Sequence, residues 1–477
     1  MITHQTTGYS ACTSFLAGRL ATVDGSTIIG RNEDARAAWP KHFVVHPHQE
    51  FSEPQIFKSN DNGFTLNLPS VAAKYTATPE WTDKFGLFEE DGINEYGVAM
   101  SATESAYTNS QALGADPLVT NGISEEAMVT VTLPYIKTAR AGVLYLGNII
   151  EKYGTAETNG ILFSDNQEVW YMETAAGHQW VAQRIPDDSY AVVANQLAIQ
   201  EIDFEDQDNF LFVPGLKEFV TQNHLNPHRN GFNFREIFGT HDLSDAYYNT
   251  PRVWYGQKLL NPGVVQAPQS QNLPFIRKAE KLIQVSDVAQ ILSSHYEGTP
   301  FDPIGIGDQR QKTQYRPISL AKTQESHILQ MRPNLPAAIA GIQWLAMGVA
   351  AQSLYIPFYA GIKDTPTSYK NGSETYQPDS AYWIYKQAGV LVDSHYLEFG
   401  SLLADVQEKT TQQLLSNLHI SDKMALTLEG KALENYLTSQ SNQNAALGLQ
   451  AMQQLSAQLI TKMTDMSPLN FKQDMNL

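Results

Sequence analysis

Two segments near the amino terminus set the expected fold, Ser10-Ala11-Cys12-Thr13-Ser14-Phe15-Leu16 and Thr27-Ile28-Ile29-Gly30-Arg31-Asn32-Glu33-Asp34. Both contain short apolar runs, and the turn residues Asp24-Gly25-Ser26 lie between them. Apolar runs that flank such a turn predict a β-hairpin, here with a loop from about residue 18 to 25. We expect this hairpin to place Arg31 opposite Cys12. A thiol beside a fixed positive charge favours the thiolate, so the hairpin predicts a reactive cysteine.

Cys12 is the only cysteine in the 477 residues, and two other interpretations of it stay open. A lone cysteine in a large chain is most often a small buried hydrophobic residue. The small residues before Cys12 also suit a secretory cleavage site. Such a site needs a basic start and an apolar core, and the first nine residues contain neither. The sequence therefore does not favour an export signal.

The bulk composition is that of a globular protein with one large domain or two ordinary ones. Hydrophobic residues make up 42% of the chain, and no apolar run approaches the ~20 residues of a membrane span. The formal charge of -18 disfavours nucleic acid and anionic lipid as partners. A single cysteine cannot form an internal disulfide, which suits a reducing compartment. We expect a cytoplasmic globular protein.

The pattern along the chain predicts strands first and helices last. We expect a strand that Pro47 ends, a helix after Ser124, and a second helix from about Thr138 to Gly154. The β-rich runs 161–163, 168–173, 178–184 and 190–194, separated by turn residues, predict a meander. Asn195 follows its last strand, as a catalytic amide or as a turn cap.

The carboxyl-terminal part has its own pattern. Residues 354–359 predict a further sheet element, and the chain is helical in composition from Asp379. Leu414, Leu415, Leu418 and Ile420 predict an amphipathic helix, which we interpret as a cap on the domain, or alternatively as an oligomer contact. We find no internal repeat and no long linker, so one domain with a helical extension is expected.

Most common catalytic motifs are absent from the sequence. It contains no Gly-x-Ser-x-Gly, P-loop, zinc-type cysteine pair or His-Glu-x-x-His. His46-Pro47-His48 is only a weak metal candidate, and His327 has no partner nearby in the sequence. No histidine accompanies Cys12 as a base. If the Ala11–Cys12 bond were cut, the α-amine of Cys12, with a reference pKa of ~7.7–8.0, could act as that base.

Several motifs together resemble the dipeptidase A family. These enzymes are N-terminal-nucleophile cysteine hydrolases, distantly related to choloylglycine hydrolases and penicillin V acylases. The resemblance extends from about residue 10 to about 400, and the order and number of the motifs make it specific. Its main motifs are Cys12-Thr13-Ser14, Asp24 to Ile29, Arg31-Asn32-Glu33-Asp34, Asn94-Glu95-Tyr96-Gly97-Val98, Ala194-Asn195-Gln196 and Arg252-Val253-Trp254.

This resemblance implies an α+β fold, a four-layer αββα sandwich, with a propeptide over residues 1–11, a hydrolase domain over 12–400 and a helical extension over 401–477. It implies Cys12 as the nucleophile and its liberated amine as the base. Arg31 and Asp34 would tune and hold these groups. Asn195 would be the oxyanion donor, and Arg252 matches the distal arginine of the acylases.

One departure concerns the second oxyanion donor. The acylases carry another asparagine where this chain reads Ser101-Ala102-Thr103-Glu104. The second donor must then be another group, such as a backbone N–H, and Glu104 could instead face the ammonium group of a substrate.

The implied activity is hydrolysis of dipeptides through a thioester, without metal or cofactor. The partners implied by this activity are small dipeptides, and a homo-oligomer stays an open alternative for the carboxyl-terminal helices. Three alternatives remain: an amidase for non-peptide acyl amides, a non-catalytic binding relative, and a metallohydrolase.

Overall fold

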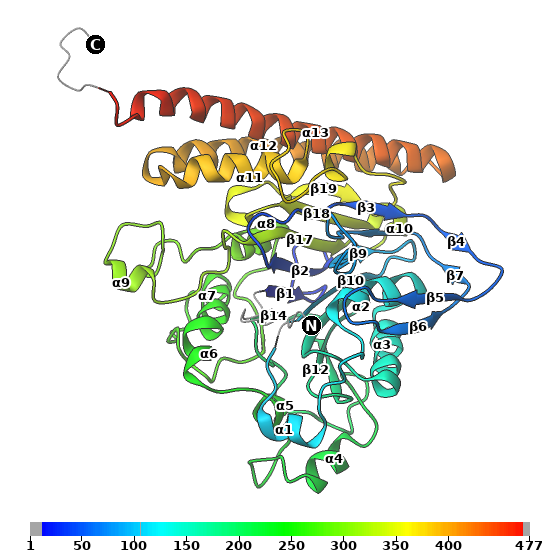
Figure 1. Ribbon diagram of the computed structural model, residues 1–477. Helices are drawn as coiled ribbons and strands as arrows, with labels where there is room; N and C mark the ends of the chain where they lie inside the picture. Colours follow the sequence, from blue (N-terminus) through cyan, green and yellow to red (C-terminus); the bar gives the residue numbers. More distant parts are fainter. Residues whose placement is uncertain (1–11, 105, 471–477) are drawn as a thin grey trace.

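The computed structural model describes residues 12–104 and 106–470, and two antiparallel sheets dominate it (Figure 1). The seven-stranded sheet has the order β16-β14-β1-β2-β17-β18-β19. Its strands are β1 Thr13–Ala17, β2 Thr27–Asp34, β14 Tyr190–Val193, β16 Ile276–Arg277, β17 Thr323–Met331, β18 Gly341–Met347 and β19 Ile356–Tyr359. The six-stranded sheet has the order β15-β13-β12-β11-β10-β9. Its strands are β9 Asp91–Ile93, β10 Ala99–Glu104, β11 Asn159–Ser164, β12 Val169–Thr174, β13 Trp180–Ile185 and β15 Phe210–Phe212.

The smaller elements lie around these sheets. Three two-stranded ribbons pair β3 Val44–His46 with β8 Tyr75–Ala77, β4 Gln49–Glu50 with β7 Val71–Ala72, and β5 Gln55–Lys58 with β6 Thr65–Leu68. The helices before the carboxyl-terminal part are α1 Ser110–Ala115, α2 Glu125–Thr132, α3 Ala139–Tyr153, α4 Leu216–Gln222, α5 Phe234–Phe238, α6 Leu243–Tyr248, α7 Thr250–Leu260, α8 Val285–Leu292, α9 Gln309–Lys312 and α10 Ala337–Ala340. The helices expected after Ser124 and from Thr138 to Gly154, and the strand before Pro47, are confirmed.

The hairpin expected at the amino terminus is confirmed as β1 and β2. The turn side chain of Asp24 accepts a hydrogen bond from the Ser26 N–H, and Gly25 has a φ of 77°, which suits glycine. The register differs from the expected one, because Ser14 rather than Cys12 lies opposite Arg31. The Arg31 side chain therefore reaches the thiol diagonally across the two strands.

Two hydrophobic cores lie on the two faces of the seven-stranded sheet. Successive side chains of a strand point to opposite faces, so Leu16 joins one core and Phe15 the other. The first core fills the space between the two sheets and extends under α2 and α3. The second core lies between the seven-stranded sheet, α8 and the carboxyl-terminal helices. This packing buries every residue of β1 and β2, including their polar ones.

The expected meander is only partly right. β11, β12 and β13 are neighbours in the six-stranded sheet, but β14 leaves it and pairs with β1 in the other sheet. The crossing is held at Gly18, whose N–H donates to the Ser189 carbonyl. A Cβ at Gly18 would overlap the carbonyl oxygens of Pro186 and Asp187, so the close approach of the two loops requires glycine. Asn195 consequently follows a strand that lies next to β1. The sequence predicts its position after the last strand of the run, but not that this strand pairs with β1.

The carboxyl-terminal helices cover β18 and β19 at the top of Figure 1. They are α11 Ala381–Asp393, α12 Tyr396–Ala425 and α13 Gly430–Met463, and α12 spans the boundary expected at residue 400. The expected amphipathic helix is present, with Leu414 and Leu418 buried, whereas Leu415 and Ile420 are exposed.

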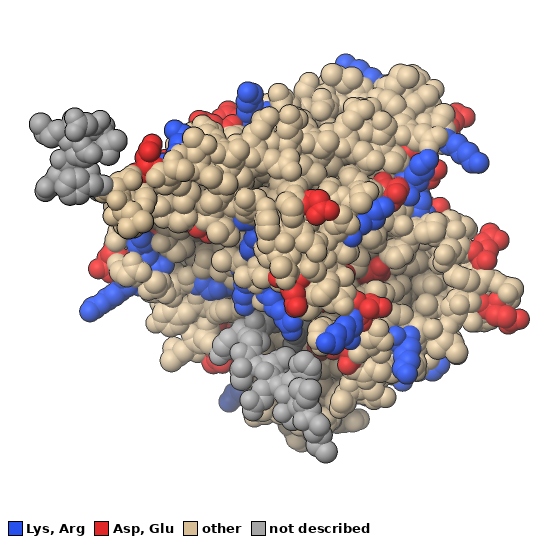
Figure 2. All heavy atoms as spheres, turned by 45° about the horizontal axis from the view of Figure 1, so that its top comes forward, with Lys and Arg blue, Asp and Glu red and all other residues tan. Residues whose placement is uncertain are grey.

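Few charged side chains lie over this helical layer (Figure 2), and residues 435–461 of α13 contain none. The oligomer contact expected for this part stays a prediction. Within residues 12–104 and 106–470, no helix combines the length and hydropathy that a membrane crossing requires.

Candidate active site

Cys12 lies directly before β1, buried between the sheets. Arg31 donates a hydrogen bond from Nη1 to the Cys12 Sγ over 3.2 Å, and the thiol lies 3.4 Å from Glu33 Oε2. Arg31 and Glu33 are two residues apart on β2, so their side chains share the face that looks toward the six-stranded sheet. The structure thus brings the predicted nucleophile and the predicted arginine together, and adds Glu33 as a partner that the resemblance does not include.

The Arg31 guanidinium is held by groups from three other segments. Its Nε donates to Ser101 Oγ over 2.9 Å, and Nη2 donates to the Glu90 side chain over 2.7 Å. Nη1 also forms an ion pair with Glu33 and lies 3.9 Å from Glu125 Oε1. Lys41 Nζ contacts the second oxygen of Glu90 over 2.7 Å. Three carboxylates and two cations therefore converge next to Cys12.

The thiol of Cys12 does not have the lowered pKa that the sequence predicts beside an arginine. Burial raises the pKa of Cys12 well above its usual value, and the negative charge of Glu33 raises it further. The positive charge of Arg31 acts in the opposite direction and is outweighed. The pKa of Cys12 is therefore shifted in the direction opposite to the expected one.

Arg252, from α7, connects Cys12 to Asn195. Its Nη1 donates to the Cys12 carbonyl oxygen over 2.6 Å and to Thr13 Oγ1 over 2.9 Å. Its Nη2 donates to Asn195 Oδ1 and Asn249 Oδ1, both over 2.7 Å. Its Nε donates to the Tyr248 carbonyl over 2.8 Å. All five N–H donors of this buried side chain are thus engaged.

Asn195 is fully buried just after β14. A guanidinium only donates hydrogen bonds, so the bond from Arg252 identifies which end of the Asn195 amide is the oxygen. The Nδ2 donor is therefore the other end. The loop that follows is fixed by Glu173, whose carboxylate accepts from the N–H groups of Ala198 and Ile199 over 2.6 and 3.2 Å.

The role that the resemblance implies for Asp34, tuning the thiol and amine and holding the amine in place, stays a prediction. Asp34 forms an ion pair with Arg316 over 2.5 Å and accepts a hydrogen bond from Thr323. Arg316 in turn lies 3.4 Å from Thr13 Oγ1. Asp34 is therefore linked to the start of β1 through Arg316, whereas Glu33 is the carboxylate that contacts Cys12.

His327 is a member of the site that sequence reasoning missed. It is fully buried on β17, with Nε2 3.0 Å from Ser101 Oγ and Nδ1 3.0 Å from Glu325 Oε1. Ser101 connects it to Arg31. Burial lowers the pKa of His327 to about 4, so the ring is neutral at pH 7. The spacing of Glu325 and His327 on one strand is the signal that could have identified the pair.

Two groups of described residues have side chains close enough to hold a cation. They are Cys12, Glu33 and Glu125, and Asp91, Glu325 and His327, and within each group the ligand atoms lie within 4.8 Å of one another. Asp91 already accepts from Gln343 over 2.6 Å. The two histidines around Pro47 do not converge, since His46 contacts Glu89 and His48 contacts Glu95. The side chain of Glu104 lies outside the described residues.

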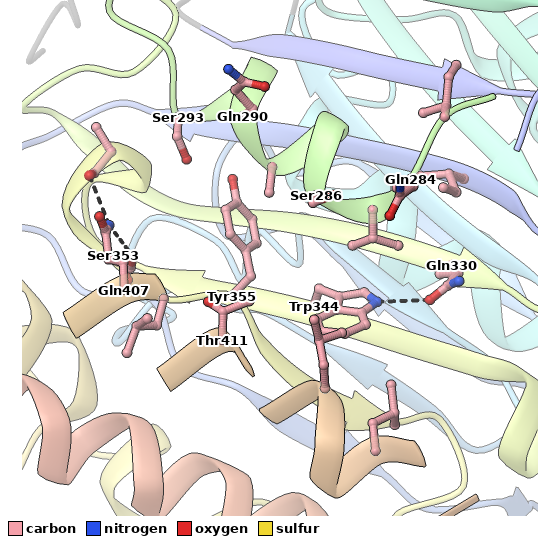
Figure 3. Close-up of a pocket in the computed structure, with 18 of the residues that line it drawn as sticks. Gln284, Ser286, Gln290, Ser293, Gln330, Trp344, Ser353, Tyr355, Gln407 and Thr411 are labelled. Carbon is pink, nitrogen blue, oxygen red and sulfur yellow. Dashed lines mark hydrogen bonds between the residues drawn. The ribbon is translucent and has the colours of Figure 1, made fainter. Parts of the chain in front are cut away.

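A cavity of about 670 Å³ lies apart from these groups, between α8, the strands β17 and β18, and α12 (Figure 3). Its lining includes Trp344, Gln407 and Tyr355. The Tyr355 hydroxyl lies 2.7 Å from Ser326 Oγ. Ser326 precedes His327 on β17, so it faces the opposite side of the sheet. The cavity and Cys12 are therefore separated by the seven-stranded sheet.

Known proteins similar to this chain agree with the resemblance in the sequence. The chain is 46% identical over 474 residues to a probable dipeptidase of Latilactobacillus sakei, with 98% of each chain covered. It is 39% identical over 432 residues to dipeptidase A of Lactobacillus helveticus, covering 89% of this chain and 91% of that one. A penicillin V acylase structure from Agrobacterium tumefaciens aligns with 16% identity and a TM-score of 0.34, over 72% of this chain and 86% of that one. The model of peptidase family C69 matches residues 11–409, and the chain therefore belongs to this family.

Proposed function

We propose that this protein hydrolyses dipeptides with Cys12 as the nucleophile, after removal of residues 1–11 has made Cys12 the first residue. The names of its relatives support the substrate class. The observation that carries the proposal is the bridge made by Arg252, which donates to both the Cys12 carbonyl and the Asn195 amide. One buried guanidinium thus holds the nucleophile and the oxyanion donor in a fixed relation.

In each turnover the Cys12 Sγ would attack the carbonyl carbon of the dipeptide, and its proton would pass to the α-amine of Cys12. Asn195 Nδ2 would donate to the oxyanion of the tetrahedral intermediate. The carbon–nitrogen bond then breaks, the departing amine takes the proton, and water hydrolyses the thioester. A high thiol pKa suits this sequence, because the proton leaves as the new bond forms and no stored thiolate is needed.

Removal of the leader needs another base, because the nitrogen of Cys12 is then part of a peptide bond. Glu33 Oε2, 3.4 Å from the Cys12 Sγ, is placed to take the thiol proton. The sulfur would attack the Ala11 carbonyl carbon, and the proton would pass to the departing nitrogen. The resulting thioester would be hydrolysed by water. Ala11 itself, and the rest of the expected propeptide, lie outside the described residues.

Arg31 and Asp34 would have supporting roles in this chemistry. Arg31 would orient the thiol, and Asp34 would hold the start of β1 through Arg316. The helices outside the two facing sheets would form the outer layers of a four-layer αββα arrangement. We further propose a cytoplasmic enzyme that needs no metal.

The presence of a single cysteine makes the test direct. Iodoacetamide should modify one site per chain and abolish dipeptide hydrolysis in the same proportion. A Cys12→Ala variant should fold and be inactive, and Cys12→Ser should keep little activity because an alkoxide is harder to form. Substantial turnover by the alanine variant would remove Cys12 from the mechanism. Loss of wild-type activity with a chelator would favour a metallohydrolase instead.

A further inference from the structure

The charges next to Cys12 do not balance within the site. The carboxylates of Glu33, Glu90 and Glu125 face the cations Arg31 and Lys41. Glu90 uses one oxygen for each cation, and Glu33 is paired with Arg31. Glu125 lies 3.9 Å from Arg31, and its Oε1 is buried without a hydrogen-bond donor. When all three carboxyl groups are ionised they therefore outnumber the two cations by one, and Glu125 is the carboxylate that lies furthest from either cation.

An uncompensated carboxylate in such a place is costly. Burial raises the pKa of Glu125 well above its usual value, and repulsion by Glu90 and Glu33 raises it further. Burial likewise raises the pKa of Glu33 to about 8. A cation that arrived beside these two groups would relieve both the repulsion and the unmet hydrogen bond.

The geometry of a dipeptide supplies such a cation at the right distance. A free α-ammonium nitrogen lies about 2.5 Å from the scissile carbonyl carbon, as the N–Cα and Cα–C bond lengths and the angle between them require. That carbon must lie ~3–3.5 Å from the Cys12 Sγ for attack. The carboxylate oxygens of Glu33 and Glu125 and the Sγ lie within 4.8 Å of one another. An ammonium group attached to the reacting carbonyl is therefore within hydrogen-bond reach of these oxygens.

We propose that Glu125, together with Glu33, forms the subsite that binds the α-ammonium group of the substrate and so selects peptides with a free amino terminus. This inference rests on the proposed dipeptidase function. The sequence suggested Glu104 as a carboxylate that could face the ammonium group of a substrate. The proposed subsite assigns this role to Glu125, the first residue of α2. Glu125 lies in the first turn of α2, where the partial positive charge of the helix start favours a carboxylate.

The test compares two substrates that differ only in the amino group, alanyl-alanine and propionyl-alanine. The wild-type enzyme should strongly prefer alanyl-alanine. Glu125→Gln should lower kcat/KM for alanyl-alanine by about 10- to 100-fold, mainly through KM, because a hydrogen bond between charged groups is lost. The slow hydrolysis of propionyl-alanine should change little. Glu125→Asp, which keeps the charge but shortens the side chain, should have an intermediate KM.

Glu126→Gln is the matched control, since it makes the same change at the next residue of α2. Glu126 accepts from the Leu87 N–H and belongs to a different set of contacts, so the preference between the two substrates should not change. Intact mass must show that all variants begin at the same residue. An equal loss on both substrates, or no loss with Glu125→Gln, would overturn the inference. No dipeptide hydrolysis by the wild-type protein would instead refute the proposed function.

Discussion

Substitution of Arg252 by lysine tests the bridge between Cys12 and Asn195. The arginine makes five hydrogen bonds from a buried, planar group, whereas a lysine ammonium offers three donors. At least two buried acceptors must therefore lose their partner. Each such loss costs ~1–3 kcal/mol, which gives about 2–6 kcal/mol of lost stability. If Asn195 loses its anchor, its amide no longer aims at the oxyanion, and kcat should fall by up to ~10²–10³ with a small change in KM.

Urea denaturation and steady-state dipeptide hydrolysis measure the two effects separately. Arg332→Lys is a control with a comparable loss of packing. Arg332 pairs with Asp422 of α12 through both Nη atoms, over 2.6 and 3.0 Å, on the far side of the sheet from Cys12. It should lose stability and keep its kcat. If Arg252→Lys keeps a wild-type kcat, or changes only KM, then the bridge does not position the oxyanion donor and the reasoning is wrong.

Two further substitutions have separate readouts. Asn195→Ala should lower kcat by ~10²–10³ with little change in KM, measured by steady-state kinetics, and a rise in KM alone would make Asn195 a binding residue. The free energy of unfolding, measured by urea denaturation at each pH, should fall less steeply between about pH 7 and 4 in His327→Gln than in the wild type. The pKa of His327 is lowered by burial to about 4, from 6.5 in the unfolded chain. The unfolded chain therefore binds more protons between these values, and wild-type stability should fall by up to about 3 kcal/mol as the pH drops through them. If the variant loses stability over this pH range as steeply as the wild type does, His327 does not titrate in this way.

The sequence pattern within each segment predicted the helices and strands of this fold better than it predicted which strands pair with one another. The β1–β2 hairpin, the helix ends at Thr138 and Gly154, and the position of Asn195 after a strand are all present. These features depend on turn residues, caps and alternation within one segment. The crossing of β14 to β1 depends instead on contacts between Gly18 and the loop after β13, which are far apart in the sequence.

The same distinction explains why some contacts at the site were not predicted. Arg31 and Asp34 are three residues apart, and on a strand such residues face opposite sides, so strand geometry alone favours Glu33 as the neighbour of Arg31. Glu90 and Glu125 come from other segments, and no sequence pattern connects them to Cys12. The pKa of Cys12 is raised rather than lowered, because burial and these carboxylates outweigh the charge of Arg31.

The central claim, that Cys12 becomes the first residue and supplies its own base, is tested most directly by intact mass spectrometry of the active enzyme. The account predicts a mass for a chain that begins at Cys12. It also predicts that the Cys12→Ala variant, purified in the same way, keeps residues 1–11. A fully active enzyme that still begins at Met1 would contradict both the propeptide and the role of the amine.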